Sequence, residues 1–321
     1  MFETGAEHTP TRRIVAVLMA LVTALGGLLI SLGGPAEAAF PGINGKIVFQ
    51  SDRTMGAGVD NPQGDDEIFS MNPNGTGLAQ LTHNDASDSE PAYSAYGNKI
   101  AFVRGSDIWV MRSDGTHQTR LTFNITQYSG YDHDPAFSPD GTKIVFSRTF
   151  TAIGSEIYVM DSDGSDEKNL ATGPGNDFGP VFSPNGARIA FTSDRDGDDE
   201  IYRMRADGTG NPINLTNNGT SDGRPDFSPD GHRIAYISYR TGSSEIFSMR
   251  ADGTDKVRLT RTAYDEGAPA YSPDGKRLVY EAGGAIARVK TDGTSPVFLP
   301  HSDGVDLRPD WQPLKVLPHP L

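Results

Sequence analysis

The sequence predicts an all-β protein built from one repeating unit of four antiparallel strands. The clearest copy begins at Pro135, reads Pro-Ala-Phe-Ser-Pro-Asp-Gly up to Gly141, and continues through two apolar runs to a Ser-Asp-Gly turn at Gly164. Short runs rich in Ile, Val, Phe and Tyr are typical of strands, and Pro, Asp and Gly set the backbone of tight turns. Copies of this unit account for most of the 321 residues.

Two sets of landmarks count the repeats. A proline opens the first strand of each unit every 40–45 residues, and a glycine ends the third strand every 40–49 residues. The prolines are Pro91, Pro135, Pro180, Pro225, Pro269 and Pro309. The glycines are Gly75, Gly115, Gly164, Gly208, Gly253 and Gly293. The spacing varies mostly because the loop after the second strand varies in length.

The first unit lacks its opening strand, and the C-terminal end supplies one. The first repeat starts directly with a second strand at Asn44, whereas Arg308–Pro313 reads Arg-Pro-Asp-Trp-Gln-Pro. Joined together, the two segments match the run that begins at Arg224. We therefore predict a six-bladed β-propeller in which the N- and C-terminal strands share one blade, because a closed ring leaves only short, protected edges.

Residues 1–38 have the pattern of an export signal. Arg12 and Arg13 precede an uncharged apolar run, Ile14–Leu32, and Ala36-Glu37-Ala38 is a small-x-small cleavage site. We expect a signal peptide over 1–38, cleaved near Ala39, and the propeller over 39–321. The alternative is an uncleaved membrane anchor, since 19 apolar residues can span a bilayer. Either outcome predicts an extracytoplasmic protein in the periplasm, in the cell envelope or outside the cell.

Charge and composition exclude several classes of function. The net charge of −14 repels phosphate backbones and anionic lipid heads, so no nucleic-acid partner is expected, and membrane contact is expected only through an uncleaved N-terminal segment. The charge suits cations, basic proteins or neutral ligands. Without cysteine, the chain has neither disulfides nor thiolate catalysis. Neither the Gly-x-Ser-x-Gly motif of serine hydrolases nor a phosphate-binding loop occurs in the sequence. We expect the protein to be a monomer.

An acidic residue stands three positions before each opening proline. The set is Asp88, Asp132, Asp177, Asp222, Glu266 and Asp306. Because strands alternate in direction, these residues are expected on one face, at the mouth of the central channel. There they would form an acidic ring that concentrates cations. The alternative is that each carboxylate bonds neighbouring backbone amides, one per blade, as turn-forming Asp residues do.

A second candidate site is the loop around Asp194, Asp196, Asp198 and Glu200. Oxygen ligands at alternate positions, with a glycine for a sharp bend, suit calcium, which makes calcium the candidate cofactor. The alternative is a solvated acidic turn, since charge runs usually face solvent.

Three histidines, His83, His133 and His301, are expected on the same face as the acidic residues. They are candidate ligands for a divalent metal, because neutral imidazole binds such ions. The alternative is that they are exposed loop residues.

The repeat resembles the WD40-like repeat of TolB-type β-propellers. The shared pattern is Pro-x-Phe-Ser-Pro-Asp-Gly followed by Glu-Ile-Tyr-x-Met-x-x-Asp-Gly, and it extends over about residues 40–313. Blade two departs from it at Ser94–Gly97 and blade six at Ala285–Arg288. The resemblance implies the propeller fold. TolB itself works in cell-envelope assemblies and carries an additional N-terminal domain that has no counterpart in this sequence, and a fold does not determine a function.

The function expected from these observations is that of an exported, non-catalytic propeller that binds a protein or peptide partner. One alternative is a metal-dependent propeller enzyme, a lyase or hydrolase, acting on a polysaccharide or small molecule at the channel mouth. The other is a calcium-stabilised carbohydrate-binding module. Clustering of the three histidines would favour the enzyme, whereas carboxylates bound to the backbone would favour the binding protein.

Overall fold

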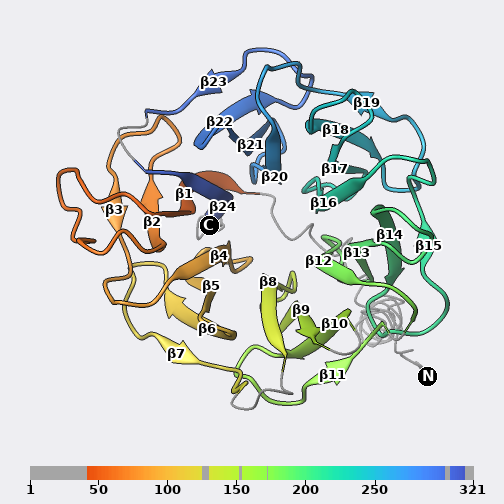
Figure 1. Ribbon diagram of the computed structural model, residues 1–321, viewed down its shortest axis with the longest axis horizontal. Coiled ribbons are helices and arrows are strands. Elements are labelled where there is room, and N and C mark those ends of the chain that lie inside the picture. The colour runs from red at the N-terminus through yellow and green to blue at the C-terminus, as the bar shows by residue number, and fades with distance from the viewer. Residues whose placement is uncertain (1–41, 125–129, 152–153, 172, 301–303, 315–321) are drawn as a thin grey trace, which may run out of the picture. The chain divides into compact units, whose positions relative to one another are not determined.

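The chain folds into six four-stranded antiparallel sheets arranged around a central axis, as a computed structural model shows (Figure 1). The structure describes residues 42–124, 130–151, 154–171, 173–300 and 304–314. These residues form 24 strands and no helix, so no helix able to cross a membrane occurs among them. The prediction of a six-bladed β-propeller is confirmed. The predicted export signal lies outside the described residues.

Each blade has the same order of strands from the axis outward. The inner strands are β24 (Asp306–Leu314), β4 (Asp88–Tyr93), β8 (Tyr131–Phe137), β12 (Asp177–Phe182), β16 (Asp222–Phe227) and β20 (Glu266–Tyr271). The second strands are β1 (Ile43–Ser51), β5 (Lys99–Arg104), β9 (Lys143–Phe150), β13 (Arg188–Ser193), β17 (Arg233–Ser238) and β21 (Arg277–Ala282).

The third and fourth strands complete the blades. The third strands are β2 (Glu67–Met71), β6 (Asp107–Arg112), β10 (Gly154–Asp161), β14 (Glu200–Arg205), β18 (Glu245–Arg250) and β22 (Ala285–Lys290). The outer strands, each of two residues, are β3 (Ala79–Gln80), β7 (Thr119–Arg120), β11 (Lys168–Asn169), β15 (Ile213–Asn214), β19 (Val257–Arg258) and β23 (Val297–Phe298). Such short outer strands protect the sheet edges from pairing with other chains.

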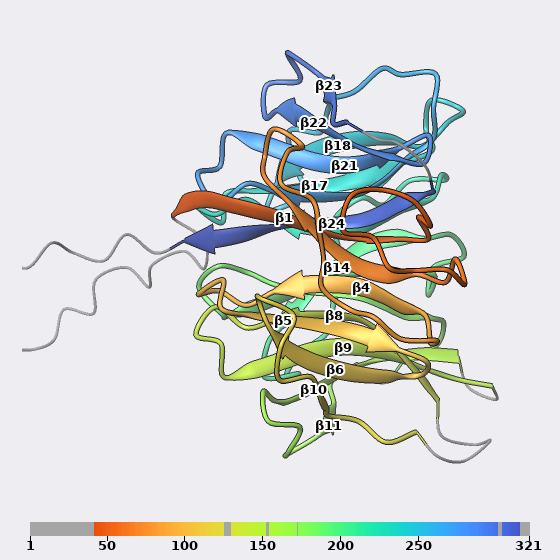
Figure 2. The same cartoon turned by 90° about the vertical axis from the view of Figure 1, so that its left-hand side faces the viewer.

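The two ends of the chain meet in blade one. Strand β24 pairs antiparallel with β1, from Ile43 opposite Leu314 to Ser51 opposite Asp306 (Figure 2). Trp311 on β24 is 2% exposed and packs with Ile47 and Phe49. The shared blade predicted from the sequence is therefore confirmed, and Trp311 fills the aromatic slot that belongs to the inner strand.

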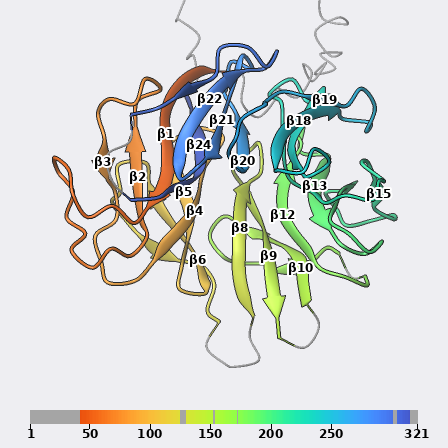
Figure 3. The same cartoon turned by 45° about the horizontal axis from the view of Figure 1, so that its top comes forward.

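The core lies between neighbouring blades, which stand side by side around the axis (Figure 3). One apolar cluster joins Val145 and Ile157 of blade three to Phe182 and Ile189 of blade four, and similar clusters fill the other interfaces. The turns between first and second strands follow the predicted chemistry. In blade three, Gly141 has a φ of +70°, and Asp140 accepts hydrogen bonds from Ser138 and Thr142.

Candidate functional site

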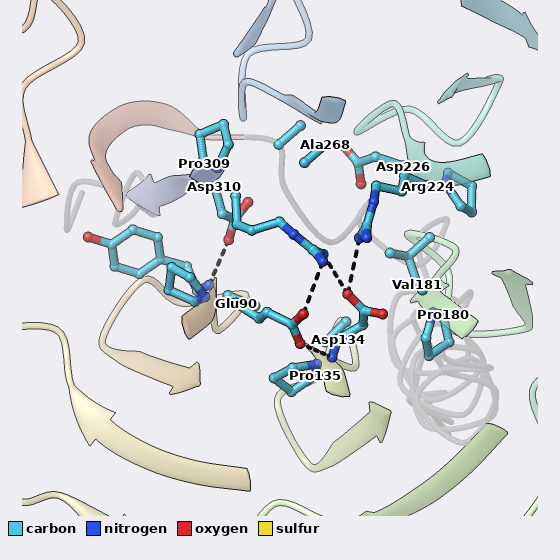
Figure 4. A pocket seen from close by; sticks show the side chains of 18 of the residues that line it. Glu90, Asp134, Pro135, Pro180, Val181, Arg224, Asp226, Ala268, Pro309 and Asp310 are labelled. Atoms are coloured by element: carbon cyan, nitrogen blue, oxygen red, sulfur yellow. Dashed lines mark hydrogen bonds and ion pairs between the residues drawn. The ribbon is translucent and has the colours of Figure 1, made fainter. Parts of the chain in front are cut away.

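The six inner strands surround a central pocket with room for water of about 170 Å³. Two layers of side chains line it, one from the residue before each opening proline and one from the residue after it (Figure 4). The first layer is Glu90, Asp134, Gly179, Arg224, Ala268 and Arg308. The second layer is Ala92, Ala136, Val181, Asp226, Ala270 and Asp310. The first layer is charged at four of its six positions, and the second is mostly apolar.

A distortion of each inner strand aims the first layer at the axis. In five blades a β-bulge interrupts the pairing with the second strand, as between Gly223 and Asp226, and β24 has a register shift at the same place. The residue before the proline has a positive φ in all six blades, for example +52° at Arg224. This conformation is roughly 1–2 kcal/mol less favourable than the right-handed one for residues other than glycine. Five blades carry that cost at the pocket, which is the kind of strain that accumulates at functional sites.

Hydrogen bonds hold the strained residues in place. The backbone N–H of Arg224 donates to Thr192 Oγ1 at 3.0 Å, and that of Glu90 donates to Gln50 Oε1 at 3.0 Å. The N–H of Arg308 donates to Glu281 Oε1 at 2.7 Å. The acceptor in each case comes from the neighbouring blade, so the geometry of the first layer depends on the closed ring.

An ion-pair network joins the four charged residues of the first layer. Arg308 lies 2.6 Å from Asp134 and 3.0 Å from Glu90, and Arg224 lies 3.2 Å from Asp134 (Figure 4). The N–H of Asp134 also donates to Glu90 at 2.6 Å. Burial alone would raise the pKa of Asp134, but the two arginines outweigh it and hold that pKa well below its usual range. Burial and the neighbouring Asp134 charge raise the pKa of Glu90.

The second layer holds two carboxylates with no ion pair to a described cation. Asp226 accepts a hydrogen bond from the N–H of Tyr271 at 2.7 Å, and Asp310 accepts one from the N–H of Tyr93 at 2.6 Å, so each ties its blade to the next. Burial, reinforced by the charge of Asp310, raises the pKa of Asp226 to about 8. Burial raises the pKa of Asp310 to about 6. At neutral pH Asp226 in the second layer therefore favours its protonated form, whereas a free carboxylate would be ionised.

The six acids predicted for the channel mouth lie elsewhere. All are only 0–3% exposed, and none lines the pocket. Five of them pair with an arginine of their own blade rather than with backbone amides alone. The pairs are Asp88 with Arg104, Asp132 with Arg148, Asp177 with Arg195, Asp222 with Arg240, and Asp306 with Arg53. The expected acidic ring is therefore corrected to a set of separate, buried ion pairs, because the bulge turns a later residue toward the axis.

Each of these arginines also lies over two aromatic rings of its blade. The guanidinium carbons are 4.7–5.8 Å from the ring centroids, which is the range of cation–π contacts. In blade five, Arg240 packs on Tyr236 and Phe247 and holds Asp222 at 2.8 Å. We call this combination of arginine, two rings and inner-strand acid the arginine latch. Its signal in the sequence was the arginine that recurs in the second strand or directly after it in five of the blades.

Blade six has no arginine latch. Its inner-strand acid, Glu266, accepts hydrogen bonds from Thr260, from Thr262 at 3.0 Å and from the N–H of Ile246 at 3.2 Å. Those donors all come from blade five or the loop that follows it. Glu266 is the one acid of the six with no ion pair to a described arginine.

The candidate calcium ligands do not converge. Asp194 accepts from the N–H of Asn176 at 2.5 Å, Asp196 from Tyr202 and Asn214, and Glu200 from Thr216 and Asn218. One oxygen of Asp198 is buried without a hydrogen-bond partner. The described ranges contain no group of three or more His, Asp or Glu side chains placed to share a metal ion. Calcium binding remains an untested prediction.

The candidate histidines are in different settings. His83 is exposed in the loop after β3, whereas His133 is half-buried on β8 and its ring stacks on Tyr131 at 6.5 Å. His301 lies outside the described residues. Sequence reasoning missed the residues that do line the pocket. Their only signal was chemical variety at the positions beside the repeated proline.

The family model of the TolB beta propeller domain matches residues 124–315, more than half of the chain. The chain belongs to the TolB β-propeller family. This TolB-type propeller is similar to the crystal structure of TolB from Acinetobacter baumannii, with 25% identity, a TM-score of 0.72, and coverage of 95% of this chain and 74% of that one. Comparison with curated proteins gives no match.

Two other solved structures share the fold with this TolB-type propeller at lower identity. The putative TolB from Agrobacterium tumefaciens is 21% identical with a TM-score of 0.66, over 82% of this chain and 91% of that one. An oligogalacturonate lyase in complex with manganese is 16% identical with a TM-score of 0.54, over 73% of this chain and 70% of that one. Since the fold is shared by TolB proteins and by a lyase, the function has to be argued from the site.

Proposed function

We propose that this chain is an exported, non-catalytic propeller that binds a protein or peptide partner at its central channel. The observation that carries the proposal is the first layer, which presents two cations and two anions on strained, hydrogen-bonded backbone around a small pocket. Paired charges of both signs suit the amides, carboxylates and amines of a polypeptide. Holding them rigid before binding lowers the entropic cost of recognition.

The size of the pocket supports a peptide group as the ligand. A cavity of about 150 Å³ admits one benzene molecule, so the channel's 170 Å³ has room for one side chain or chain end. Sites for drug-sized ligands usually have about 300–1,000 Å³. A sugar polymer would have to lie across the mouth rather than enter it.

Cross-linking from the pocket tests the proposal. A photoreactive benzoylphenylalanine in place of Ala268 faces the channel, while the same residue in place of exposed Ile213 on β15 is the control. In the organism that expresses the chain, we expect a discrete protein adduct from position 268 alone. Val181→Trp, which fills the pocket and replaces none of its charged residues, should abolish it. Adducts of equal yield from both positions would contradict a channel site.

Two further measurements address export and the enzymatic alternative. N-terminal sequencing of the mature protein should begin near Ala39, whereas an intact Met1 on a membrane-bound form would support the anchor. Incubation of the purified chain with polygalacturonate and manganese should yield no unsaturated product. Product formed by the wild-type chain but not by the Val181→Trp variant would replace the proposal with a metal-dependent enzyme.

A further inference from the structure

The strand pairing of blade six shows which residue stands where the arginine of the latch would be. In blades two and three the arginine of the latch is paired across the sheet with the inner-strand acid, as Arg104 is with Asp88 and Arg148 with Asp132. Ala282 has that register position in blade six, directly opposite Glu266. Ala282 therefore occupies the backbone position from which the arginine side chain extends in blades two and three.

Two neighbours of the latch are also reduced to alanine in blade six. Ala287 pairs with Tyr280 where Phe247 pairs with Tyr236 in blade five, so the second ring under the guanidinium is gone. Ala285, the first residue of β22, stands where blade five has Glu245. Blade six thus keeps the backbone pairing, one ring (Tyr280) and the acid (Glu266), while the arginine and the second ring are replaced by alanine.

Buried polar atoms near this position have no partner. The Tyr280 side chain is fully buried, and its hydroxyl has no hydrogen-bond partner among the described residues. One carboxylate oxygen of Glu245 also has none there, whereas its other oxygen pairs with Arg258. In blade five, the equivalent Tyr236 hydroxyl receives a hydrogen bond from Arg240 at 3.4 Å. Leaving such groups unsatisfied is costly, so each calls for an explanation.

Each of the two tyrosines lies beside a pair of buried acids. Burial raises the pKa of Tyr236, and the charges of Asp222 and Glu200 add to the rise, while Arg240 opposes it. Burial raises the pKa of Tyr280, and the charges of Glu266 and Glu245 add to it with no cation in opposition. Among the charged groups that act on the two tyrosines, the guanidinium is therefore what distinguishes the two sites.

An exposed apolar patch lies beside Ala282 in blade six. The rings of Tyr264 and Phe298, 51% and 47% exposed, meet edge to face at 5.9 Å. Tyr264 lies so close to Gly283 that a Cβ there would be 2.7 Å from its ring, and Val305 lies against Gly284. The patch thus borders the turn that directly follows Ala282. Exposed aromatic clusters of this kind commonly mark protein interfaces.

We propose that a partner protein supplies the missing arginine, whose guanidinium lies against the Tyr264–Phe298 rings and pairs with Glu266, Tyr280 and Glu245. The five internal latches show that this fold builds guanidinium sites from two rings and a buried acid. Arginine suits the site better than lysine because its planar fork can serve several acceptors while it stacks on a ring. The acidic net charge of −14 favours a basic partner. The site lies outside the channel and does not rest on the function proposed above.

The probe is N-acetyl-L-arginine amide, titrated into the full chain and followed by NMR. N-acetyl-L-citrulline amide is the uncharged isostere, and N-acetyl-L-lysine amide carries the charge without the planar group. We expect the arginine probe to bind roughly tenfold more tightly than the citrulline probe, as charge-assisted hydrogen bonds require. Equal affinity for the arginine and citrulline probes would overturn the proposal.

Ala282→Arg supplies the guanidinium from within the chain. We expect this variant to lose probe binding and to melt a few degrees higher, about 3 °C. Thr241→Arg adds the same charge at an exposed residue in the blade-five loop and should bind the probe as the wild type does. Unchanged probe binding by a folded Ala282→Arg variant would also overturn the proposal.

Tyr280→Phe tests the site without adding a side chain. Four blades have phenylalanine at this position, namely Phe49, Phe102, Phe146 and Phe191. The variant should be at least as stable as the wild type and bind the probe several-fold more weakly. This measurement decides the matter if Ala282→Arg fails to fold, because undiminished binding would refute the contact. Free L-arginine that bound more tightly than the capped amide would assign the site to the amino acid and overturn a protein partner.

Discussion

Blades five and six have strands of the same lengths and the same register, yet they differ in the charged residues that face the channel and form the latch. Blade five has Arg224 and Asp226 in the channel and an arginine latch at its rim, whereas blade six has Ala268 and Ala270 in the channel and no latch. The backbone ladder and the apolar core are therefore enough to specify a blade. The polar groups are additions that one blade can give up, as buried ion pairs often can be when both partners are replaced.

The largest effect should come from the apolar slot that all blades share. Trp311→Ala in blade one and Tyr271→Ala in blade six should each lower the free energy of unfolding by about 3–5 kcal/mol, because both rings are buried in interblade clusters. Denaturant unfolding monitored by fluorescence or circular dichroism measures the change. Trp311→Phe should cost less than about 1.5 kcal/mol. A small cost for Trp311→Ala would mean that the closing blade is dispensable.

Substitutions in the arginine latch should have a smaller effect on the free energy of unfolding. That effect should differ between blades five and six. Arg240→Ala leaves the buried Asp222 without its cation and should cost about 3 kcal/mol in the free energy of unfolding. Glu266→Gln in blade six should cost less than about 1 kcal/mol, since its amide oxygen can still accept from Thr260 or Ile246. Arg205→Ala, which removes an exposed pair, is the control. Equal costs for the Arg240 and Glu266 variants would contradict the distinction between the blades.

The channel carboxylates should make stability depend on pH. Because the pKa of Asp226 is raised to about 8, the folded state binds more protons than the unfolded chain between about pH 4 and pH 8. Stability is therefore favoured at low pH and lost as pH rises through this range. We expect the melting temperature to fall from pH 5 to pH 8 and the slope to flatten in Asp226→Asn.

The slope should not vanish in that variant, because burial also raises the pKa of Glu67 and Glu156 to about 7. Asp166→Asn, at an exposed turn, should leave the slope as it is. An identical pH profile for wild type and Asp226→Asn would show that the blade-five carboxylate is ionised in the channel.

The smallest expected effect concerns calcium. The carboxylates of the Asp194–Glu200 loop are directed to separate hydrogen-bond donors, so millimolar calcium and chelator should give melting temperatures within about 1 °C of each other. A calcium-dependent rise that disappears in Asp194→Asn/Asp196→Asn would instead establish the loop as a calcium site. Differential scanning calorimetry makes the comparison.

Much of the fold could be predicted from local patterns, but little of the candidate site could. Turn residues and apolar runs marked the blades, and the match of Arg308–Pro313 to the run at Arg224 located the shared blade. The pocket residues Glu90, Asp134 and Arg308 could not be assigned, because they share no residue type. The six recurring acids were conspicuous in the sequence, but five of them turned out to be buried partners of the latches, and the sixth, Glu266, is buried among donors from blade five.

The sequence by itself determined the number of blades, their boundaries and the closure of the ring, because each follows from turn chemistry repeated at a regular spacing. Only the tertiary structure decided which side chains face the channel. A left-handed residue before each proline shifts the strand register, and side chains alternate faces along a strand, so a one-residue shift reverses their direction. It also decided that in five of the six blades the first acid of the inner strand meets an arginine from the second strand or the loop after it, a contact that exists only once the blade has folded.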